Sequence, residues 1–120
     1  MDEKGKEHIK FKLATCFRII LNKKKKLEKK NKTHRIEDLK LVSSMRQLEA
    51  DSGLSYTIIQ TLSVGKRDVQ FTSLIILLES LEISLLDFAK IYDNITEKQM
   101  TEEREKIEKN QIRKKRKTLK

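Results

Sequence analysis

Apolar residues recur at steps of three and four along most of this chain, and this spacing limits its fold more than any other feature of the sequence. Residues three and four positions apart share one face of an α-helix, whereas a half-buried strand needs strict alternation, which no stretch of any length shows here. The 120 residues have the length of one compact domain, and no long repeat typical of a solenoid is present. The fold class predicted is therefore all-α, with about five core helices.

The first helix is predicted to start near Ile9 and to be long. Its apolar positions form one face, which consists of Ile9, Leu13, Cys16, Phe17, Ile20 and Leu21. A lysine-rich insertion follows Leu21; it has good helix propensity but no apolar face to bury, so we expect the helix to run on into solvent and fray. The chain is expected to return to the core at Ile36, Leu39, Leu41 and Val42.

Two short helices are predicted next, on either side of a glycine. Ser44 offers a side-chain oxygen to the free N–H groups of a helix that runs to about Asp51, and Gly53 ends that helix because glycine adopts the left-handed conformation at low cost. Ser55 caps a second helix over 55–63, which Gly65 closes. The two helices are expected to touch at Leu48, Leu54, Ile59 and Leu62.

Two further helices complete the predicted core. The first spans about 70–81 and is expected to bury Phe71, Leu74, Leu77, Leu78 and Leu81. Ser84 caps the second, whose core positions are Leu85, Phe88, Ala89 and Tyr92. Residues 96–120 hold too few apolar side chains, too far apart, for a buried stripe, so a basic tail that is flexible or helical is expected there.

The net charge of +10 at pH 7 is concentrated in the two flanks of the chain. Residues 1–40 hold 14 Lys or Arg against 6 Asp or Glu, and residues 96–120 hold 10 against 5. Residues 41–95 hold 4 against 7. Such an excess of positive charge favours an anionic partner, nucleic acid first and an acidic membrane surface second. The flanks are therefore expected to supply an attraction to phosphate that depends on salt and not on sequence.

Charge and hydrophobicity together divide the chain into three segments. Residues 1–43 hold the first helix and the insertion, which is expected to be an accessory DNA arm, a dimerisation element or a spacer. Residues 44–95 hold the other core helices and are expected to pack with the first helix as one domain. Residues 96–120 form the basic tail.

Membrane insertion and export are not expected. The longest run without a charged residue, residues 52–65, is shorter than the ~18 apolar residues of a membrane span and contains several polar residues. The N-terminus lacks the apolar segment and cleavage site of a signal peptide. We therefore expect a cytoplasmic protein with no membrane partner.

Enzymatic chemistry is not expected either. The single cysteine, Cys16, lies on an apolar helix face and is expected to be a core residue and not a nucleophile, while His8 and His34 are too far apart for zinc-ligand spacing. The sequence contains no P-loop, no dinucleotide glycine pattern and no paired carboxylates typical of a hydrolase. We predict no catalytic residue, no cofactor and no metal.

The segment from Ser44 to Arg67 is typical of a helix-turn-helix, which holds its second helix where the major groove of DNA can receive it. Glutamine binds adenine through two hydrogen bonds, hydroxyl groups reach bases or phosphates, and the N–H groups at a helix start suit phosphate. The outward face of the second helix carries such groups at Ser55, Tyr56, Thr57, Gln60 and Thr61.

Several features of this region occur in a fixed order: Gly53-Leu-Ser55, Gly65-Lys-Arg67, the helix with Leu74, Leu77 and Leu81, and Ile83-Ser-Leu-Leu-Asp-Phe88. From about Ser44 to Phe88 the chain thereby resembles the XRE-type helix-turn-helix family of phage lambda repressor and Cro. The resemblance implies a five-helix DNA-binding domain that acts as a transcriptional repressor or autoregulator, typically as a homodimer on a palindromic site. By position it implies base contacts by Tyr56, Thr57, Gln60 and Thr61. It implies phosphate contacts by Ser44, Arg46, Ser55, Lys66 and Arg67.

The chain departs from the family pattern at three places. Ser44-Met45 stand where the family has Thr-Gln, which puts one phosphate contact in doubt, and Val69-Gln70 stand where it has Pro-Ser. Glu49 stands where the family has alanine at a close approach of two helices. We expect the Glu49 carboxylate to turn to solvent or the helices to pack at a looser angle.

The predicted function is that of a sequence-specific regulator of transcription that binds double-stranded DNA and reads the major groove with the helix over 55–63. An alternative is a protein-interaction module, as in an antitoxin or a mobile-element protein, because residues 41–95 are net negative and the helix over 55–63 lacks arginine. RNA binding by the basic flanks is a weaker alternative, since no exposed aromatic residues are spaced for base stacking.

Overall fold

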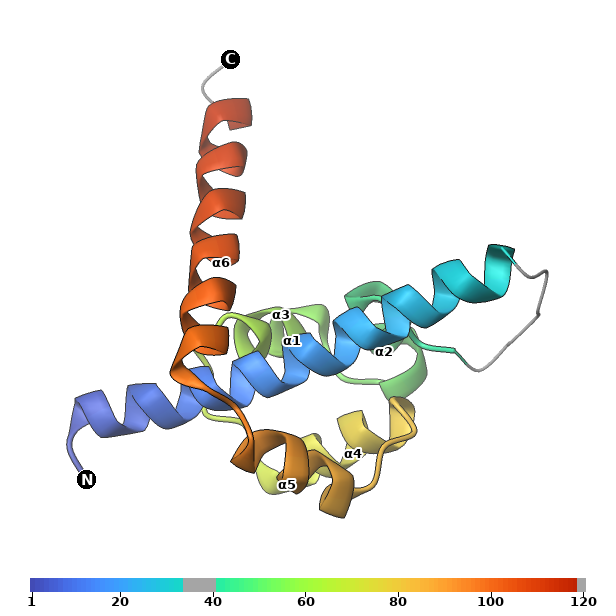
Figure 1. Ribbon diagram of the computed structural model, residues 1–120, viewed down its shortest axis with the longest axis horizontal. Coiled ribbons are helices and arrows are strands. Elements are labelled where there is room, and N and C mark those ends of the chain that lie inside the picture. The colour runs from blue at the N-terminus through green and yellow to red at the C-terminus, as the bar shows by residue number, and fades with distance from the viewer. Residues whose placement is uncertain (34–40, 119–120) are drawn as a thin grey trace.

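The structure is a computed structural model that describes residues 1–33 and 41–118. In these residues all regular structure is α-helical, and no strand occurs there, which confirms the predicted all-α class. The helices are α1 (Glu3–Thr33), α2 (Met45–Ser52), α3 (Tyr56–Ser63), α4 (Phe71–Ser80), α5 (Leu85–Asp93) and α6 (Glu97–Thr118). Figure 1 shows α1 as the long helix that crosses the molecule, with α4 and α5 on one side of it and α6 rising from the other.

One hydrophobic core joins the first five helices. α1 contacts α3, α5 and α6, α2 contacts α3 and α4, and α4 contacts α5. Leu48, Ile59 and Leu62 are almost fully buried where α2 and α3 meet the rest of the core, as predicted, and Leu54 packs against them. Each such side chain contributes about 1.5–3 kcal/mol of hydrophobic free energy. The buried core residues are Cys16, Phe17, Ile20, Leu21, Val42, Leu48, Ile59, Leu62, Leu77, Leu78, Leu81 and Phe88.

The buried face of α1 differs from the predicted one at its start. Ile9 is 42% exposed, whereas Phe11, which the predicted face leaves out, is 8% exposed. Phe11 is covered by residues of α6, and the spacing within α1 gives no sign of a helix that follows about ninety residues later. Of the residues predicted to return the chain to the core, Val42 is buried and Leu41 is half-buried, while Ile36 and Leu39 lie outside the described residues.

Three predicted core residues of α4 and α5 lie on the surface instead. Phe71 is 64% exposed, Leu85 is 44% exposed and Ala89 is also exposed. Phe71 and Leu85 are the first residues of their helices. Helical side chains lean toward the N-terminus, so a first residue leans past the end of its own helix, where no preceding turn covers it. The remaining predicted positions, Leu74, Leu77, Leu78, Leu81, Phe88 and Tyr92, are buried or half-buried.

The C-terminal segment is helical, but its first half is not solvated. Thr96 and Gln99 form a capping box: the Thr96 N–H donates to Gln99 Oε1 at 2.9 Å, and the Gln99 N–H donates to Thr96 Oγ1 at 3.1 Å. Met100 and Ile107 are 2% and 9% exposed and pack beside Phe11. The expectation that the apolar residues of this segment are too sparse to be buried is therefore wrong for these two, because they lie seven residues apart on one helix face.

Candidate nucleic-acid interface

The α2–α3 helix pair begins and turns where the sequence predicts. The Ser44 Oγ accepts a hydrogen bond from the Gln47 N–H at 3.1 Å and caps α2, and Gly53 ends α2 with a φ of 77°. The Ser55 Oγ accepts from the Ile58 N–H at 3.3 Å and caps α3. These caps satisfy N–H groups that lack a partner within the helix. Each serine hydroxyl still carries its own proton, which a phosphate oxygen can accept.

A second glycine fixes how the chain leaves α3. Gly65 has a φ of 78°, and a Cβ placed on it would lie 2.9 Å from Phe11 Cδ2 and 3.2 Å from Phe11 Cα. Glycine is therefore required at position 65 for two independent reasons: the left-handed backbone and the close approach of α1. The following Lys66 is exposed, and its N–H donates to the Thr61 carbonyl at 3.0 Å. This turn sets the place from which Lys66 and Arg67 extend.

Glu49 joins the two helices of the pair. Its Oε2 accepts the Tyr56 N–H at 2.8 Å, and its Oε1 lies 3.7 Å from Arg46 Nη1. The side chain is 38% exposed, so the expectation that the carboxylate turns to solvent is met only in part. The carboxylate instead satisfies a free N–H at the start of α3 and interacts favourably with the positive end of the helix dipole.

Arg46 and Tyr56 stack on each other. The Arg46 guanidinium carbon lies 3.9 Å from the centroid of the Tyr56 ring, within the range of a cation–π interaction. A predicted phosphate contact and a predicted base contact are thereby brought together at the first turn of α3. No pattern in the sequence indicates this pair, since the two residues belong to different helices.

Thr61 and Arg67 form a similar pair near the end of α3. The Thr61 hydroxyl donates to the Thr57 carbonyl at 2.6 Å and accepts from Arg67 Nε at 2.7 Å. The Thr61 hydroxyl proton is therefore already used within α3, which weakens its role as a direct donor to a base. Its oxygen orients the Arg67 guanidinium instead.

Thr57 and Gln60 lie between these two pairs on α3. Thr57 is exposed and Gln60 is half-exposed. Within the part of the chain that the structure describes, the polar side-chain atoms of both residues make no hydrogen bond. Of the four predicted base contacts, these two and the Tyr56 hydroxyl keep their side-chain hydrogen-bonding capacity for a ligand, whereas the Thr61 hydroxyl is already bonded.

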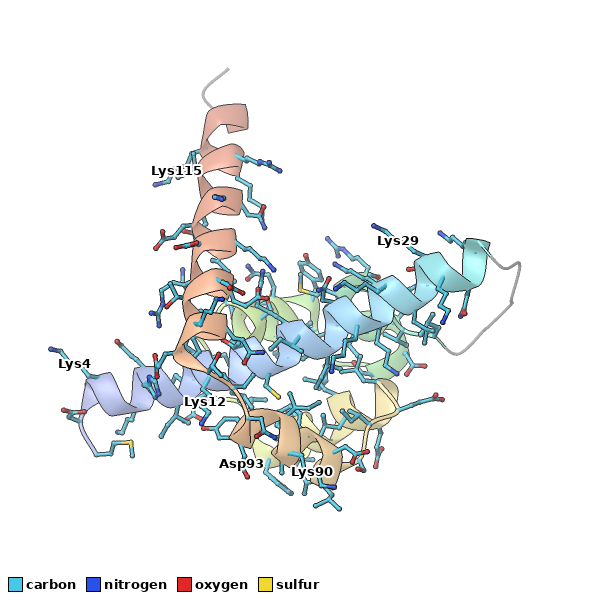
Figure 2. All side chains as sticks on the ribbon, in the orientation of Figure 1. Lys4, Lys12, Lys29, Lys90, Asp93 and Lys115 are labelled. Carbon is cyan, nitrogen blue, oxygen red and sulfur yellow. The ribbon has the colours of Figure 1, made fainter. Side chains whose placement is uncertain are left out.

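Charge is distributed unevenly over the molecule. Residues 22–32, the lysine-rich end of α1, hold seven lysines and one glutamate, and residues 109–118 of α6 hold six basic residues and no acidic one. Residues 71–93 hold four acidic residues and one lysine. Figure 2 shows Lys29 and Lys115 near the outer ends of α1 and α6, and Lys90 and Asp93 on α5 at the opposite side of α1. The two basic helix ends therefore lie away from the acidic α4–α5 side.

Cys16 is a core residue, as predicted. Its side chain is fully buried, and burial raises the pKa of the thiol to about 12, so the sulfur stays protonated at neutral pH. The described ranges contain no group of three or more His, Cys, Asp or Glu side chains placed to hold a metal ion. No helix in those ranges is both long enough and apolar enough to cross a membrane.

Comparisons of the chain with protein-family models, with curated proteins and with solved structures found no match. The resemblance to XRE-type domains therefore rests on the residues from Ser44 to Phe88 and on their spacing.

Proposed function

We propose that this protein is a sequence-specific regulator of transcription, a repressor or autoregulator, that binds double-stranded DNA with α3 in the major groove. The observation that carries this proposal is a pair of oriented arginines. Arg46 stacks on Tyr56 at the start of α3, and Arg67 is held by Thr61 near its end. Phosphates border the major groove on both sides, so guanidinium groups held at both ends of one helix face suit a duplex.

The roles of the helix-pair residues follow from these contacts. Gln60 pairs with a base edge through its amide, and Thr57 supplies a hydroxyl or methyl contact beside it. Tyr56 and, through its methyl group, Thr61 contact bases at the edges of the same face, and each of them orients one arginine. The hydroxyl groups of Ser44 and Ser55, the Lys66 ammonium and the two guanidinium groups contact phosphates.

The same proposal includes a homodimer on a palindromic site. α5 offers a face for a second copy, because Leu85, Leu86 and Ala89 are neighbours on this helix and are exposed, Leu86 by 65%. A two-fold dimer joins identical patches, so one apolar helix face on each copy is sufficient. The expected sign is a selected DNA sequence that repeats with inverted symmetry.

A second candidate, a protein-interaction module of the antitoxin or mobile-element kind, is favoured by Glu49. Its carboxylate occupies the first N–H of α3, where a phosphate would otherwise bind. In that case the α2–α3 face would bind a protein and not a base sequence. The inhibited partner would then co-purify with the protein.

Selection of bound duplexes from a random pool tests the proposal. We expect one enriched half-site, about as long as the stretch of major groove that one helix reads, and an inverted copy of it one or more helical turns away. Recovery of a pool with no enriched sequence at physiological salt would overturn the proposal. Selection by a variant with Gln60→Ala then identifies the base that this residue reads.

A further inference from the structure

α6 is packed at its beginning and projects from the molecule at its end. Met100, Glu103 and Ile107 are buried against α1, whereas residues 108–115, here called the C-terminal arm, are all exposed. Figure 1 shows α6 rising from α1 away from α4 and α5. Intrinsic helix propensity gives an exposed segment of this length little stability. The direction of the C-terminal arm therefore depends on the contacts at the beginning of α6.

Those contacts include a largely buried ion pair. Arg18 Nε lies 2.9 Å from Glu103 Oε2, and their side chains are 20% and 11% exposed. Arg18 also donates from Nη1 to the carbonyl of Ser63, the last residue of α3, at 3.5 Å. Charge-assisted hydrogen bonds of this kind fix geometry more strongly than neutral ones. The direction of the C-terminal arm is therefore set relative to α1 and to α3.

The end of α6 is basic and holds no acidic residue, whereas its beginning holds charges of both signs. Glu97, Glu102, Glu103, Glu105 and Glu108 all precede Lys109, and residues 109–118 hold basic residues with no acidic one. Cations in the last turn of a helix interact favourably with its dipole, but that effect falls off within one turn and does not require a run of ten residues. The basic run over 109–118 therefore favours a partner with an extended negative charge.

The face of the arm that continues toward the helix pair can be identified. A groove between α1 and α6 is lined by Lys25, Lys106 and Asn110, and it reaches Met45 at the start of α2 and Ser63 at the end of α3. Arg113 follows Asn110 by three residues and Lys106 by seven, so the three share this face.

We propose that the C-terminal arm is an oriented phosphate-binding element that holds the backbone of the same duplex beside the segment read by α3, with the Arg18–Glu103 ion pair setting its direction. This inference rests on duplex DNA being the partner. The molecule measures 47 × 44 × 29 Å, so its two longer dimensions exceed the ~34 Å of one turn of DNA. The arm thus extends the contact surface beyond the groove that one helix occupies.

The first test compares two pairs of substitutions that remove the same charge. The affinity for a mixed-sequence duplex of about four helical turns is measured by fluorescence anisotropy over a range of salt concentrations.

The first pair is Lys109→Gln with Arg113→Gln. For each phosphate that is no longer neutralised, this pair should lower the slope of log affinity against log salt by about 0.9 and the affinity at physiological salt by roughly fivefold. The control, Lys4→Gln with Lys90→Gln, removes two cations far from the arm, which Figure 2 shows for Lys4 and Lys90. Equal effects of the two pairs would overturn the proposal.

The second test separates orientation from charge. Glu103→Ala and Glu102→Ala each remove one negative charge from neighbouring positions of α6 and keep good helix propensity, but only the first breaks the ion pair with Arg18. If charge alone acts, both variants bind the mixed-sequence duplex slightly more tightly. The proposal predicts that Glu103→Ala binds this duplex roughly fivefold more weakly than Glu102→Ala does, which is the loss of affinity expected when about one phosphate contact is removed. Equal affinity of the two variants, with helix content unchanged by circular dichroism, would contradict an oriented arm.

The two proposals fail in different ways. If no base sequence is preferred while both pairs of variants differ as predicted, the arm binds DNA but the helix pair does not read it. If a sequence is selected while the variants in each comparison behave alike, the regulator proposal stands and the oriented arm is wrong.

Discussion

The helix pair and the C-terminal arm both carry groups suited to DNA, but they hold them in opposite ways. Residues 41–70 contain three basic and three acidic residues, and both arginines there are oriented by a second side chain, at 3.9 Å from the Tyr56 ring centroid and 2.7 Å from Thr61 Oγ1. The arm has many exposed cations and no acidic residue after Glu108. Few oriented groups suit selection of a sequence, whereas many exposed cations suit attraction to any phosphate backbone. The net charge of the chain therefore says more about affinity than about specificity.

The largest expected difference between the two regions is in stability. Leu48→Ala, in a fully buried site of α2, should lower the free energy of unfolding by ~2–5 kcal/mol because it leaves a cavity in the core. Ile112→Ala, in the arm, where the side chain is 52% exposed, should change it by less than about 0.5 kcal/mol. Urea denaturation followed by circular dichroism measures both. Similar reductions in the two variants would show that the arm is packed and not projecting.

The two turns of the helix pair differ as well. Gly65→Ala should lower the free energy of unfolding by roughly 2–4 kcal/mol for two reasons. The added Cβ would lie 2.9 Å from Phe11, and alanine is strained in a backbone with a φ of 78°. Gly53→Ala has nearly the same φ, 77°, but nothing within 4 Å, so it should cost only ~1–2 kcal/mol. Thermal unfolding of the two variants compares them. Equal costs would mean that α1 does not press on the Gly65 turn.

Base selection should depend on the helix pair alone. Gln60 is proposed to read one base of the selected site. Gln60→Ala should therefore reduce, by ~1–3 kcal/mol, the difference in binding free energy between the selected site and a site altered at that base. Gln111→Ala removes the same amide from the arm and should leave that discrimination unchanged. Competition binding with the two duplexes measures the ratio. Weaker discrimination in the arm variant would contradict the division between the two regions.

The smallest effect concerns the lysine-rich end of α1. The Ser43 hydroxyl donates to Glu28 Oε2, and this hydrogen bond holds the pKa of Glu28 below its ordinary value, with a smaller contribution from Lys32. Because the folded pKa is the lower one, the hydrogen bond stabilises the protein above the ordinary glutamate pKa, and this contribution disappears as the pH falls through the lowered value. An NMR titration of the Glu28 carboxyl should show the pKa rising toward its ordinary value in Ser43→Ala. An unchanged pKa would mean that Ser43 does not hold this end of α1.

The sequence predicts the local features of the helix pair and misses the contacts between distant segments. Ser44, Gly53 and Ser55 cap or end their helices as expected, because capping depends on residues only a few positions apart. The pairing of Arg18 with Glu103 joins residues 85 positions apart, and no spacing rule predicts it.

The same limit explains the errors in burial. Helical spacing tells which residues share a face, but not where the neighbouring helix ends, so it predicts Phe71 and Leu85 in the core although both lie outside it. In α6 the error is the reverse, because Met100 and Ile107 are expected to be exposed and are buried. They pack against Phe11, a contact that the periodicity of α6 does not reveal.

Truncation after Glu108 tests the central claim most directly, since it removes the basic residues of the arm and leaves the packed half of α6 in place. The affinities of the truncated and full-length chains for the selected duplex and for a mixed-sequence duplex are measured over a range of salt concentrations. We predict that truncation weakens both complexes by the same factor and lowers both salt slopes by about 0.9 for each phosphate that the arm neutralises, so the ratio of the two affinities is unchanged. A changed ratio, or salt slopes equal to those of the full-length chain, would contradict the account.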